Sequence, residues 1–256
     1  MIVSGQNPKI KGIRRLRHCK DDRTILEGPH LVEEACRLGL SFETSLATPD
    51  FLSGEGTREL AAHIEPPPLA VEPSLLKELT DVDAPQGILV VASLPRGGVE
   101  CLPTDGDLYL WGEALQDPGN VGALSRSLEA AGGHGMALSP GSAHPNRPRA
   151  LRASAGSLLR LPVARDASLE DVRRRLEARS PRVLALSARR GLPIWEADLS
   201  GPLLLAVGSE GAGLSAEART AADLEVHVPT AAPVESLNAA VAAALVLFEV
   251  RRRRLG

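Results

Sequence analysis

A carboxamide and a guanidinium lie close together in residues 117–126, directly after a predicted turn. Asn120 can both donate and accept hydrogen bonds, and Arg126 can donate two parallel ones to a single phosphate group. Pro118 fixes its own φ and Gly119 permits a positive φ, which is typical of a tight turn. The segment could therefore bind a polar ligand, although it is equally compatible with a plain loop.

A glycine-rich loop, residues 208–214, follows the apolar run 203–207 and contains the carboxylate of Glu210. Its glycines would let a ligand approach the backbone closely. The loop lacks the Gly-Lys-Ser/Thr ending of a phosphate loop and the glycine spacing of a dinucleotide site, which argues against ATP and NAD as ligands. A plain turn before a helix at Ser215 is the alternative interpretation.

Further polar side chains follow the apolar run 224–228. The hydroxyl of Ser236 is placed to cap a predicted helix, and Asn238 would lie in the first turn of that helix. These two residues could equally be a cap and a solvated side chain without a role in a site. We expect His227 to be an ordinary strand residue with a normal partner. No ligand spacing indicates a metal, and no hydrolase serine motif is present.

The elements that position these residues alternate between strands and helices. The predicted strands are 108–111, 135–138, 161–163, 183–186, 203–207 and 224–228, and the predicted helices are 121–131, 169–179 and 237–252. This alternation predicts a largely parallel sheet covered on both faces. The polar segments would then meet at the carboxyl ends of strands, where open α/β sheets bind ligands. The last helix carries one apolar stripe at helical spacing: Leu237, Val241, Leu245 and Phe248.

A smaller α/β domain is predicted before this one. Helical patterns at 31–38 and 74–79 alternate with extended patterns at 45–47 and 87–91. The stretch 95–107 is rich in glycine, proline and aspartate, which is typical of a linker. We therefore expect a first domain over 1–96, a linker over 97–106 and a second domain over 107–256.

The composition is that of an ordinary soluble protein, with 43% hydrophobic and 24% charged residues. No apolar run approaches the roughly 20 residues that span a bilayer, and no signal-peptide core is present. Cys19, Cys36 and Cys101 are widely spaced and are expected to be reduced thiols. A cytoplasmic protein with neither a membrane nor a metal partner is therefore expected.

Basic residues are clustered, although the net charge is only −3. The stretch 144–165 contains five arginines and no acidic residue, and the first 23 residues carry seven lysines and arginines against two aspartates. Clustered arginine suits phosphate groups. The C-terminal run 251–254 is expected to be solvated surface charge instead. The candidate RNA contacts are Arg15, Arg17, Arg147, Arg149 and Arg152.

In their order along the chain, these segments resemble the motifs of the SpoU/TrmH group of SPOUT methyltransferases. The first motif is 117–132 with its continuations at 138–142 and 152–157, the second is 208–214 and the third is 228–238. Residues 6–9 and 26–35 resemble the substrate-binding domain that often precedes this catalytic domain. The resemblance covers nearly the whole chain.

The resemblance implies transfer of a methyl group from S-adenosylmethionine to a ribose 2′-hydroxyl of RNA. It also implies a C-terminal domain with a mostly parallel sheet and a deep trefoil knot, a homodimer formed through that domain, and a small α/β RNA-binding domain before it. The N-terminal domain favours ribosomal over transfer RNA. A transfer-RNA enzyme, a non-catalytic RNA-binding protein of the same fold and a nucleotide-binding enzyme are the alternatives.

The resemblance assigns roles to single residues as well. Arg126 would either accept the proton of the attacking hydroxyl or stay cationic and orient the ribose, and Asn120 would orient the ribose or the arginine. Glu210, Ser236 and Asn238 complete the implied catalytic set. Where many relatives have Ile-Pro-Met, this chain has Val-Pro-Thr at 228–230, a change expected to alter the adenine pocket modestly. The implied cofactor contacts are Gly208, Ser209, Glu210, Gly211, Val228, Pro229, Ser236 and Leu237.

Overall fold

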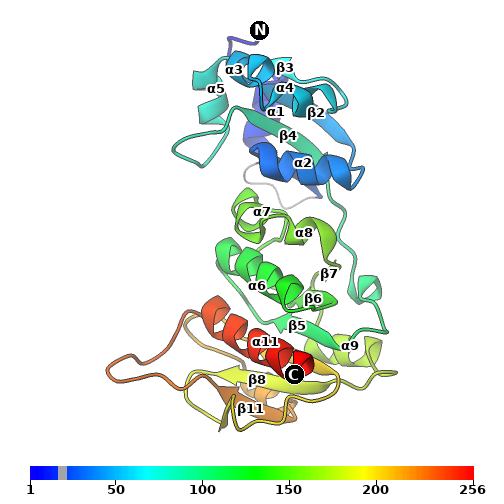
Figure 1. Cartoon of the computed structure of the whole chain (residues 1–256), viewed down its shortest axis with the longest axis vertical. Helices are drawn as coiled ribbons and strands as arrows, with labels where there is room; N and C mark the ends of the chain where they lie inside the picture. The colour runs from blue at the N-terminus through cyan, green and yellow to red at the C-terminus, as the bar shows by residue number, and fades with distance from the viewer. Residues whose placement is uncertain (17–21) are drawn as a thin grey trace. The chain divides into compact units, whose positions relative to one another are not determined.

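The computed structural model describes residues 1–16 and 22–256, which form two compact units (Figure 1). The first unit contains residues 1–95 and 146–160, and the second contains 96–145 and 161–256. The structure thus places 146–160 with the first unit and the expected linker 97–106 within the second, where Leu102 is buried. None of the described helices combines the length and the apolar character needed to traverse a bilayer.

The first unit is built on a four-stranded sheet in the order β1-β4-β2-β3. Its strands are β1 (Arg23–Glu27), β2 (Phe42–Ala47), β3 (Leu69–Ala70) and β4 (Ile88–Ser93). β4 runs antiparallel to both β1 and β2, and β3 runs parallel to β2. The helices are α1 (Pro8–Leu16), α2 (Pro29–Arg37), α3 (Pro49–Ser53), α4 (Arg58–Ala62) and α5 (Pro73–Glu78), with α7 (Pro148–Ser154) and α8 (Ser157–Arg160) from the later segment. The elements predicted in 25–95 are confirmed.

Ion pairs and a buried amide hold the later segment in the first unit. Arg152 on α7 pairs with Glu27 on β1 at 2.6 Å, and only 6% of the Glu27 side chain is exposed. Arg160 pairs with Glu34 on α2 at 2.9 Å. The side-chain nitrogen of Asn146 donates to the carbonyl of Leu94 at 2.7 Å. Acidic residues from the first 95 positions therefore neutralise part of the acid-free stretch.

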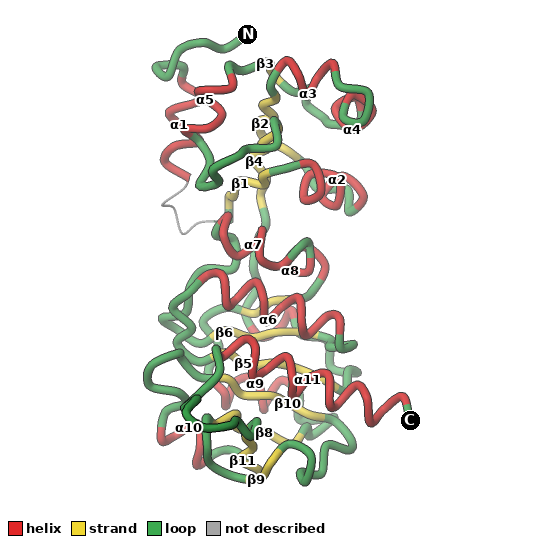
Figure 2. The backbone as a smooth tube through the Cα atoms, turned by 60° about the vertical axis from the view of Figure 1, so that its left-hand side comes forward, coloured by secondary structure: helices red, strands yellow, loops and turns green. Residues whose placement is uncertain are grey.

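The second unit is built on a seven-stranded sheet in the order β7-β6-β5-β10-β8-β11-β9 (Figure 2). Every neighbouring pair in this sheet is parallel, which confirms the predicted parallel α/β fold. The strands are β5 (Leu108–Gly112), β6 (Gly135–Leu138), β7 (Val163–Ala164), β8 (Arg182–Ser187), β9 (Leu192–Pro193), β10 (Leu203–Val207) and β11 (Leu224–His227). The helices are η1 (Val99–Cys101), α6 (Pro118–Ala130), α9 (Leu169–Arg175), α10 (Ala216–Thr220) and α11 (Ala239–Leu255).

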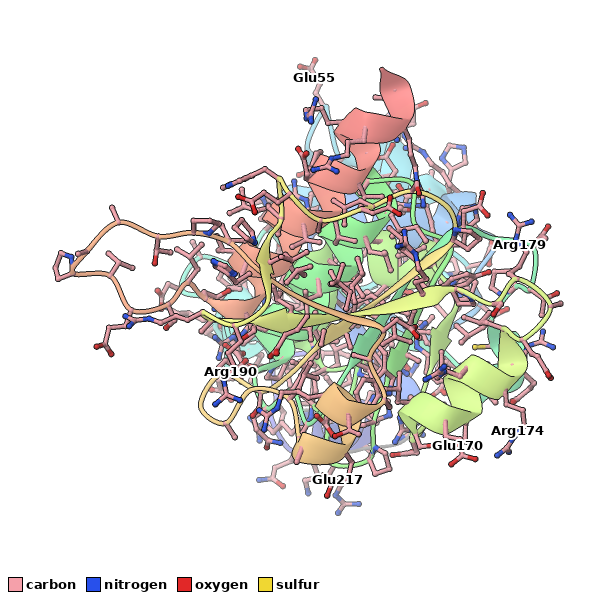
Figure 3. All side chains as sticks on the ribbon, turned by 90° about the horizontal axis from the view of Figure 1, so that it is seen from below. Glu55, Glu170, Arg174, Arg179, Arg190 and Glu217 are labelled. Carbon is pink, nitrogen blue, oxygen red and sulfur yellow. The ribbon has the colours of Figure 1, made fainter. Side chains whose placement is uncertain are left out.

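Short-range signals in the sequence fix the helix starts. Asp117 caps α6 by accepting from the backbone N–H of Gly119, and Pro118 occupies the first turn. Ser168 and Asp171 form a capping box at the start of α9. The exposed face of α9 carries the Glu170–Arg174 ion pair at 2.9 Å, and both side chains point into solvent (Figure 3).

The start of α11 corrects one prediction. The helix begins at Ala239, and its cap is Asn238, whose side-chain oxygen accepts from the backbone N–H groups of Ala240 and Val241. The predicted start at residue 237 with Ser236 as the cap is therefore wrong. Asn and Ser cap helices about equally well, so the sequence alone did not decide between them.

The apolar stripe of α11 lies at the surface. Val241, Leu245 and Phe248 are 51%, 44% and 48% exposed. The buried face is made mainly of smaller residues, Ala240, Ala243, Val246, Leu247 and Val250, and it packs on α6 and β10. Small side chains let the helix approach the sheet closely, which leaves the larger apolar residues outside.

The C-terminal arginines tie α11 to neighbouring loops. Arg253 donates to the backbone carbonyls of Ala197, Ile194 and Trp195 at 2.7 to 3.0 Å. Arg254 donates to the carbonyls of Asp107 and Gly201. The expectation of simple solvated charge is therefore wrong for these two residues, because they satisfy backbone acceptors at the end of the domain.

The cysteines behave as expected in the described part of the chain. Cys36 and Cys101 are free thiols, and Cys19 lies outside the described residues. Burial raises the pKa of both described thiols above its ordinary value, which keeps them protonated and unreactive.

Candidate functional site

The three predicted motifs follow strand ends at the same edge of the second sheet. The first begins after β5, the second after β10 and the third after β11. β5 and β10 are adjacent, and only β8 separates β10 from β11, so the three loops leave parallel strands that lie close together in the sheet. This arrangement is the one in which open α/β sheets gather ligand-binding residues.

Asn120 joins the three motifs through its side chain. It is only 8% exposed. Its amide nitrogen donates to the carboxylate of Glu210, and its carbonyl oxygen accepts from the amide nitrogen of Asn238 at 3.1 Å. A carboxylate only accepts, so the nitrogen of Asn120 must face Glu210 and its oxygen must face Asn238. The sequence prediction that these residues come together is confirmed by this hydrogen-bonded chain.

Asn238 has a second role, which fixes the orientation of its side chain in this series of hydrogen bonds. Its side-chain oxygen is occupied by the backbone N–H groups of Ala240 and Val241, at 2.9 and 3.2 Å. The side-chain nitrogen of Asn238 is free of these contacts, and it donates to the carbonyl oxygen of Asn120. The start of α11 is thereby hydrogen-bonded to the start of α6, and any movement of one helix start would disturb the other.

The glycine loop has a shape that its own backbone requires. A Cβ atom at Gly208 would lie 2.0 Å from the carbonyl carbon of Gly213, and Gly213 has a φ of +68°. The end of the loop is anchored on β5's side of the sheet, because the carboxylate of Glu113 accepts from the backbone N–H of Ser215 at 2.7 Å. Ser215 in turn caps α10. The glycines therefore serve the fold of the loop as well as access to its backbone.

A cavity of about 520 Å³ lies between these loops. Its volume falls within the roughly 300–1,000 Å³ typical of cofactor and small-molecule sites. Pro229 lines a neighbouring cavity of about 350 Å³ instead. The predicted cofactor residues that line the larger cavity are Gly208, Ser209, Glu210, Gly211, Val228, Ser236 and Leu237.

Several cavity residues were missed by the sequence analysis. The end of β8 and the loop after it contribute residues 186–188 and Arg190. Arg219 on α10 and Glu225 on β11 also line the cavity. β8 ends at the same edge as β10, so the rule that ligands bind at strand ends could have indicated its loop. No motif marks Arg219 or Glu225 in the sequence.

Arg126 is exposed on α6 and is not among the residues that line either cavity. It makes no hydrogen bond or ion pair within the described residues. Six residues separate it from Asn120, which corresponds to roughly 120° around the helix. The two side chains therefore project from different faces of α6, and the role implied for Arg126 stays a prediction.

The predicted RNA contacts that the structure describes belong to the first unit. Arg15 is exposed on α1, Arg149 is exposed on α7, and Arg147 precedes α7. Arg152 is engaged by Glu27, and Arg17 lies outside the described residues. The structure brings these arginines into one unit, and their contact with RNA stays a prediction.

His227 ends β11, as expected for a strand residue. Its Nδ1 atom is buried and has no hydrogen-bond partner in the described residues, so the expected ordinary partner is not found. Within the same described part of the chain, no three His, Cys, Asp or Glu side chains gather in a way that could hold a metal ion.

The fold and the polar cluster define a class of protein: a parallel α/β domain with its ligand cavity at the strand ends, preceded by a small accessory domain. Residues 107–248 match the model of the SpoU rRNA Methylase family, and residues 7–90 match the MRM3-like substrate binding domain. The chain belongs to the SpoU rRNA methylase family, which confirms the resemblance drawn from the motifs.

Named relatives agree with this membership. The 23S rRNA (guanosine(2553)-2′-O)-methyltransferase RlmP of Bacillus subtilis is 33% identical and covers 98% of both chains. The 23S rRNA (uridine(2479)-2′-O)-methyltransferase of Streptomyces viridochromogenes is 35% identical over 77% of this chain and 71% of its own length. The crystal structure of the SpoU methyltransferase AviRb from the same organism, in complex with AdoMet, superposes with a TM-score of 0.89 at 28% identity and covers 98% of this chain and 99% of its own.

Proposed function

We propose that this protein transfers the methyl group of S-adenosylmethionine to a ribose 2′-hydroxyl of ribosomal RNA. The observation that carries the proposal is the hydrogen-bonded chain Glu210–Asn120–Asn238 beside a cavity lined by the second and third motifs. Relatives named as 23S rRNA 2′-O-methyltransferases support ribosomal RNA as the substrate. The accessory domain matched at residues 7–90 supports it as well.

S-adenosylmethionine fits the cavity in size and in lining. The lining residues Gly208 and Gly211 expose backbone groups to a ligand. The related structure with AdoMet bound supports the same assignment. When bound, the cofactor supplies a methyl group on a positively charged sulfonium, which is already activated for in-line displacement. The chain then has to position the acceptor hydroxyl and remove its proton.

The chain's own polar residues are proposed to do that work. Asn120 is held rigidly between Glu210 and Asn238, so the edge of the cavity near it is preorganised for binding. Arg126 either accepts the hydroxyl proton or stays cationic and orients ribose and phosphate. The second role agrees better with the chemistry of a guanidinium, which donates hydrogen bonds and has no acceptor. In both roles, loss of Arg126 removes turnover.

A homodimer is proposed through α11. Val241, Leu245 and Phe248 form an exposed apolar stripe on a helix whose other face is fully packed. An exposed patch of this kind on a folded domain marks an interaction surface. A second copy of the chain is the proposed occupant, because the resemblance implies pairing through this domain. Phe248→Glu should shift the protein to a monomer in sedimentation, whereas the control Leu192→Glu, a change at an exposed residue of β9, should not.

The decisive experiment is transfer of a labelled methyl group to separated ribosomal and transfer RNA, followed by mapping of the modified ribose. Label at a single 2′-oxygen of ribosomal RNA is the expected result. Label in transfer RNA only would establish the alternative substrate. RNA binding without label, from protein that binds the cofactor, would indicate a non-catalytic member of the fold.

Since the proposed substrate belongs to the ribosome, we also propose that the enzyme acts in the cytoplasm.

A further inference from the structure

One carboxylate oxygen in the cavity accepts no hydrogen bond from any residue that the structure describes. Glu225 lines the cavity from β11, and its Oε1 atom is buried without a donor in the described residues. The other carboxylate that lines the cavity, Glu210, accepts from Asn120. Glu113, which lies outside the cavity lining, accepts from the N–H of Ser215 at the end of the glycine loop. A buried carboxylate oxygen without a donor is unfavourable, because it has lost its hydrogen bonds to water and no protein hydrogen bond replaces them.

The neighbouring loop holds Glu225 in this position. A Cβ atom at Gly191 would lie 1.9 Å from the carbonyl oxygen of Glu225, so the loop after β8 lies directly over the backbone of β11. Gly191 has a φ of +80°, a conformation that glycine adopts without strain. The backbone that carries the carboxylate is therefore fixed, and a ligand would meet it in one place.

The strand register places Glu225 away from the catalytic chain of hydrogen bonds. Glu225 is paired with Ala185 of β8, and Ala185 is paired with Ala206 of β10. β10 and β11 are two strand spacings apart, so Glu225 lies about 10 Å across the sheet from the strand that leads to Glu210. It therefore faces a part of the ligand other than the group presented to Asn120.

The charged groups around Glu225 leave it available to a ligand. Arg190 and Arg219 line the same cavity, and neither forms an ion pair with Glu225 in the described residues. Arg219 donates instead to the carbonyl of Leu214 at 3.0 Å. The two guanidiniums can meet a carboxylate on the ligand, whereas Glu225 needs donors. Arg190 lies on the loop after β8 and Glu217, outside the cavity, lies on α10 (Figure 3).

We infer that Glu225 accepts hydrogen bonds from the ribose hydroxyls of the cofactor's adenosine half. Two adjacent hydroxyls offer two neutral donors to one carboxylate, and acidic side chains recognise ribose in the same way in dinucleotide-binding folds. Glu225 is thus a specificity-determining residue for the nucleoside and takes no part in the transfer. This inference rests on the proposed identity of the cavity as the cofactor site.

The test compares ligands that differ by single groups, by calorimetry with the full-length protein. The probes are S-adenosylmethionine, 5′-methylthioadenosine, which lacks the amino acid, and the 2′-deoxy and 3′-deoxy forms of 5′-methylthioadenosine. Glu225→Gln should weaken binding of the first two by the same factor, roughly tenfold or more for a lost bond to a charged acceptor. The wild type should bind at least one deoxy form more weakly than 5′-methylthioadenosine by a similar factor. The affinity of Glu225→Gln should differ little between that deoxy form and 5′-methylthioadenosine.

Other results would overturn the inference. If Glu225→Gln weakened binding of S-adenosylmethionine alone, Glu225 would contact the ammonium group of the cofactor. If the wild type bound both deoxy forms as tightly as 5′-methylthioadenosine, the ribose hydroxyls would be excluded as its partners, even if the variant failed to fold. Glu217→Gln, an exposed carboxylate of α10, is the matched control and should bind every probe as the wild type does. A wild type that binds none of the nucleosides would refute the proposed cofactor cavity itself, a result distinct from an unaffected Glu225 variant.

Discussion

The two units use partly buried polar contacts for different purposes. In the second unit, Asn120 connects Glu210 and Asn238 at the border of a cavity. In the first unit, the Arg152–Glu27 pair fastens α7 to β1 in the interior of a packed unit. Residue type alone does not separate the two cases. What separates them is whether the polar group faces a cavity that a ligand can enter.

The comparison also shows what each unit can tolerate. The site of the second unit relies on close backbone approach and on hydrogen bonds that join two side-chain amides and one carboxylate, and both are sensitive to small displacements. The segment 146–160 relies on ion pairs whose removal costs stability without touching the cavity. The variants below separate these two kinds of dependence.

The largest effect is expected at the glycine loop. Gly208→Ala would place a Cβ 2.0 Å from the backbone of Gly213, so the loop has to move. Displacement of packed backbone costs about 1–3 kcal/mol or more, and we expect cofactor affinity to fall by roughly 100-fold. A Cβ at Gly211 would meet no other atom within 4 Å, so the control Gly211→Ala should keep the melting temperature of the wild type. Unchanged calorimetric affinity in Gly208→Ala would contradict the assigned site.

The next effect concerns turnover. Asn120→Ala leaves Glu210 and Asn238 without their shared partner, and kcat should fall by roughly 100-fold, as for loss of one preorganised polar group. Single-turnover methyl transfer measures this loss. Ser127→Ala, a change at a half-buried residue of the same helix whose hydroxyl makes no hydrogen bond in the described residues, is the control and should leave kcat unchanged. Normal turnover of Asn120→Ala would show that the hydrogen bonds of Asn120 to Glu210 and Asn238 are not needed for methyl transfer.

A smaller effect, on stability alone, is expected in the first unit. Arg152→Ala removes the ion pair to the carboxylate of Glu27, whose side chain is 6% exposed, and should cost about 1–3 kcal/mol. Hydrogen-exchange protection of the β1 amides should fall accordingly. Arg174→Ala breaks the Glu170 pair on α9, whose side chains are 66% and 82% exposed, and should cost less than about 0.5 kcal/mol. If Arg152 served RNA binding alone, its loss would change RNA affinity and leave this protection intact.

The sequence predicted the second unit well because its signals are local. Alternating strand and helix patterns gave the parallel sheet, and motifs placed after strands had to meet at one edge. The bonded set Asn120, Glu210 and Asn238 follows from that geometry. The packing of 146–160 with the first unit could not be predicted, since its partner acids Glu27 and Glu34 lie more than one hundred residues earlier in the chain.

Two further features of the second unit could not be predicted from the sequence, for the same physical reason. The stripe Val241, Leu245 and Phe248 has the spacing of a buried helix face, and spacing does not reveal that alanines occupy the true packing surface. Glu225 carries no motif, and it becomes notable only because its carboxylate lines a cavity without a donor. Periodicity identifies faces and elements, whereas the satisfaction of each polar atom is a property of the folded chain.

The smallest predicted effect is a pH dependence at the end of α11, and it tests whether ion pairs there act as they do in the first unit. Hydrogen bonds from Arg252 and then Arg253 lower the pKa of Glu249 from 4.5 to about 2. A lowered carboxyl pKa stabilises the folded state above pH 4.5, and that contribution is lost as pH falls toward 2. Glu249→Gln should therefore be less stable than the wild type at pH 7, by less than about 1 kcal/mol because the arginines are solvent-screened. The difference should shrink between pH 4.5 and 2, measured by hydrogen exchange of the last turns of α11. A difference that persists at the acid limit would mean that Glu249 stabilises the end of α11 by packing and not by its charge.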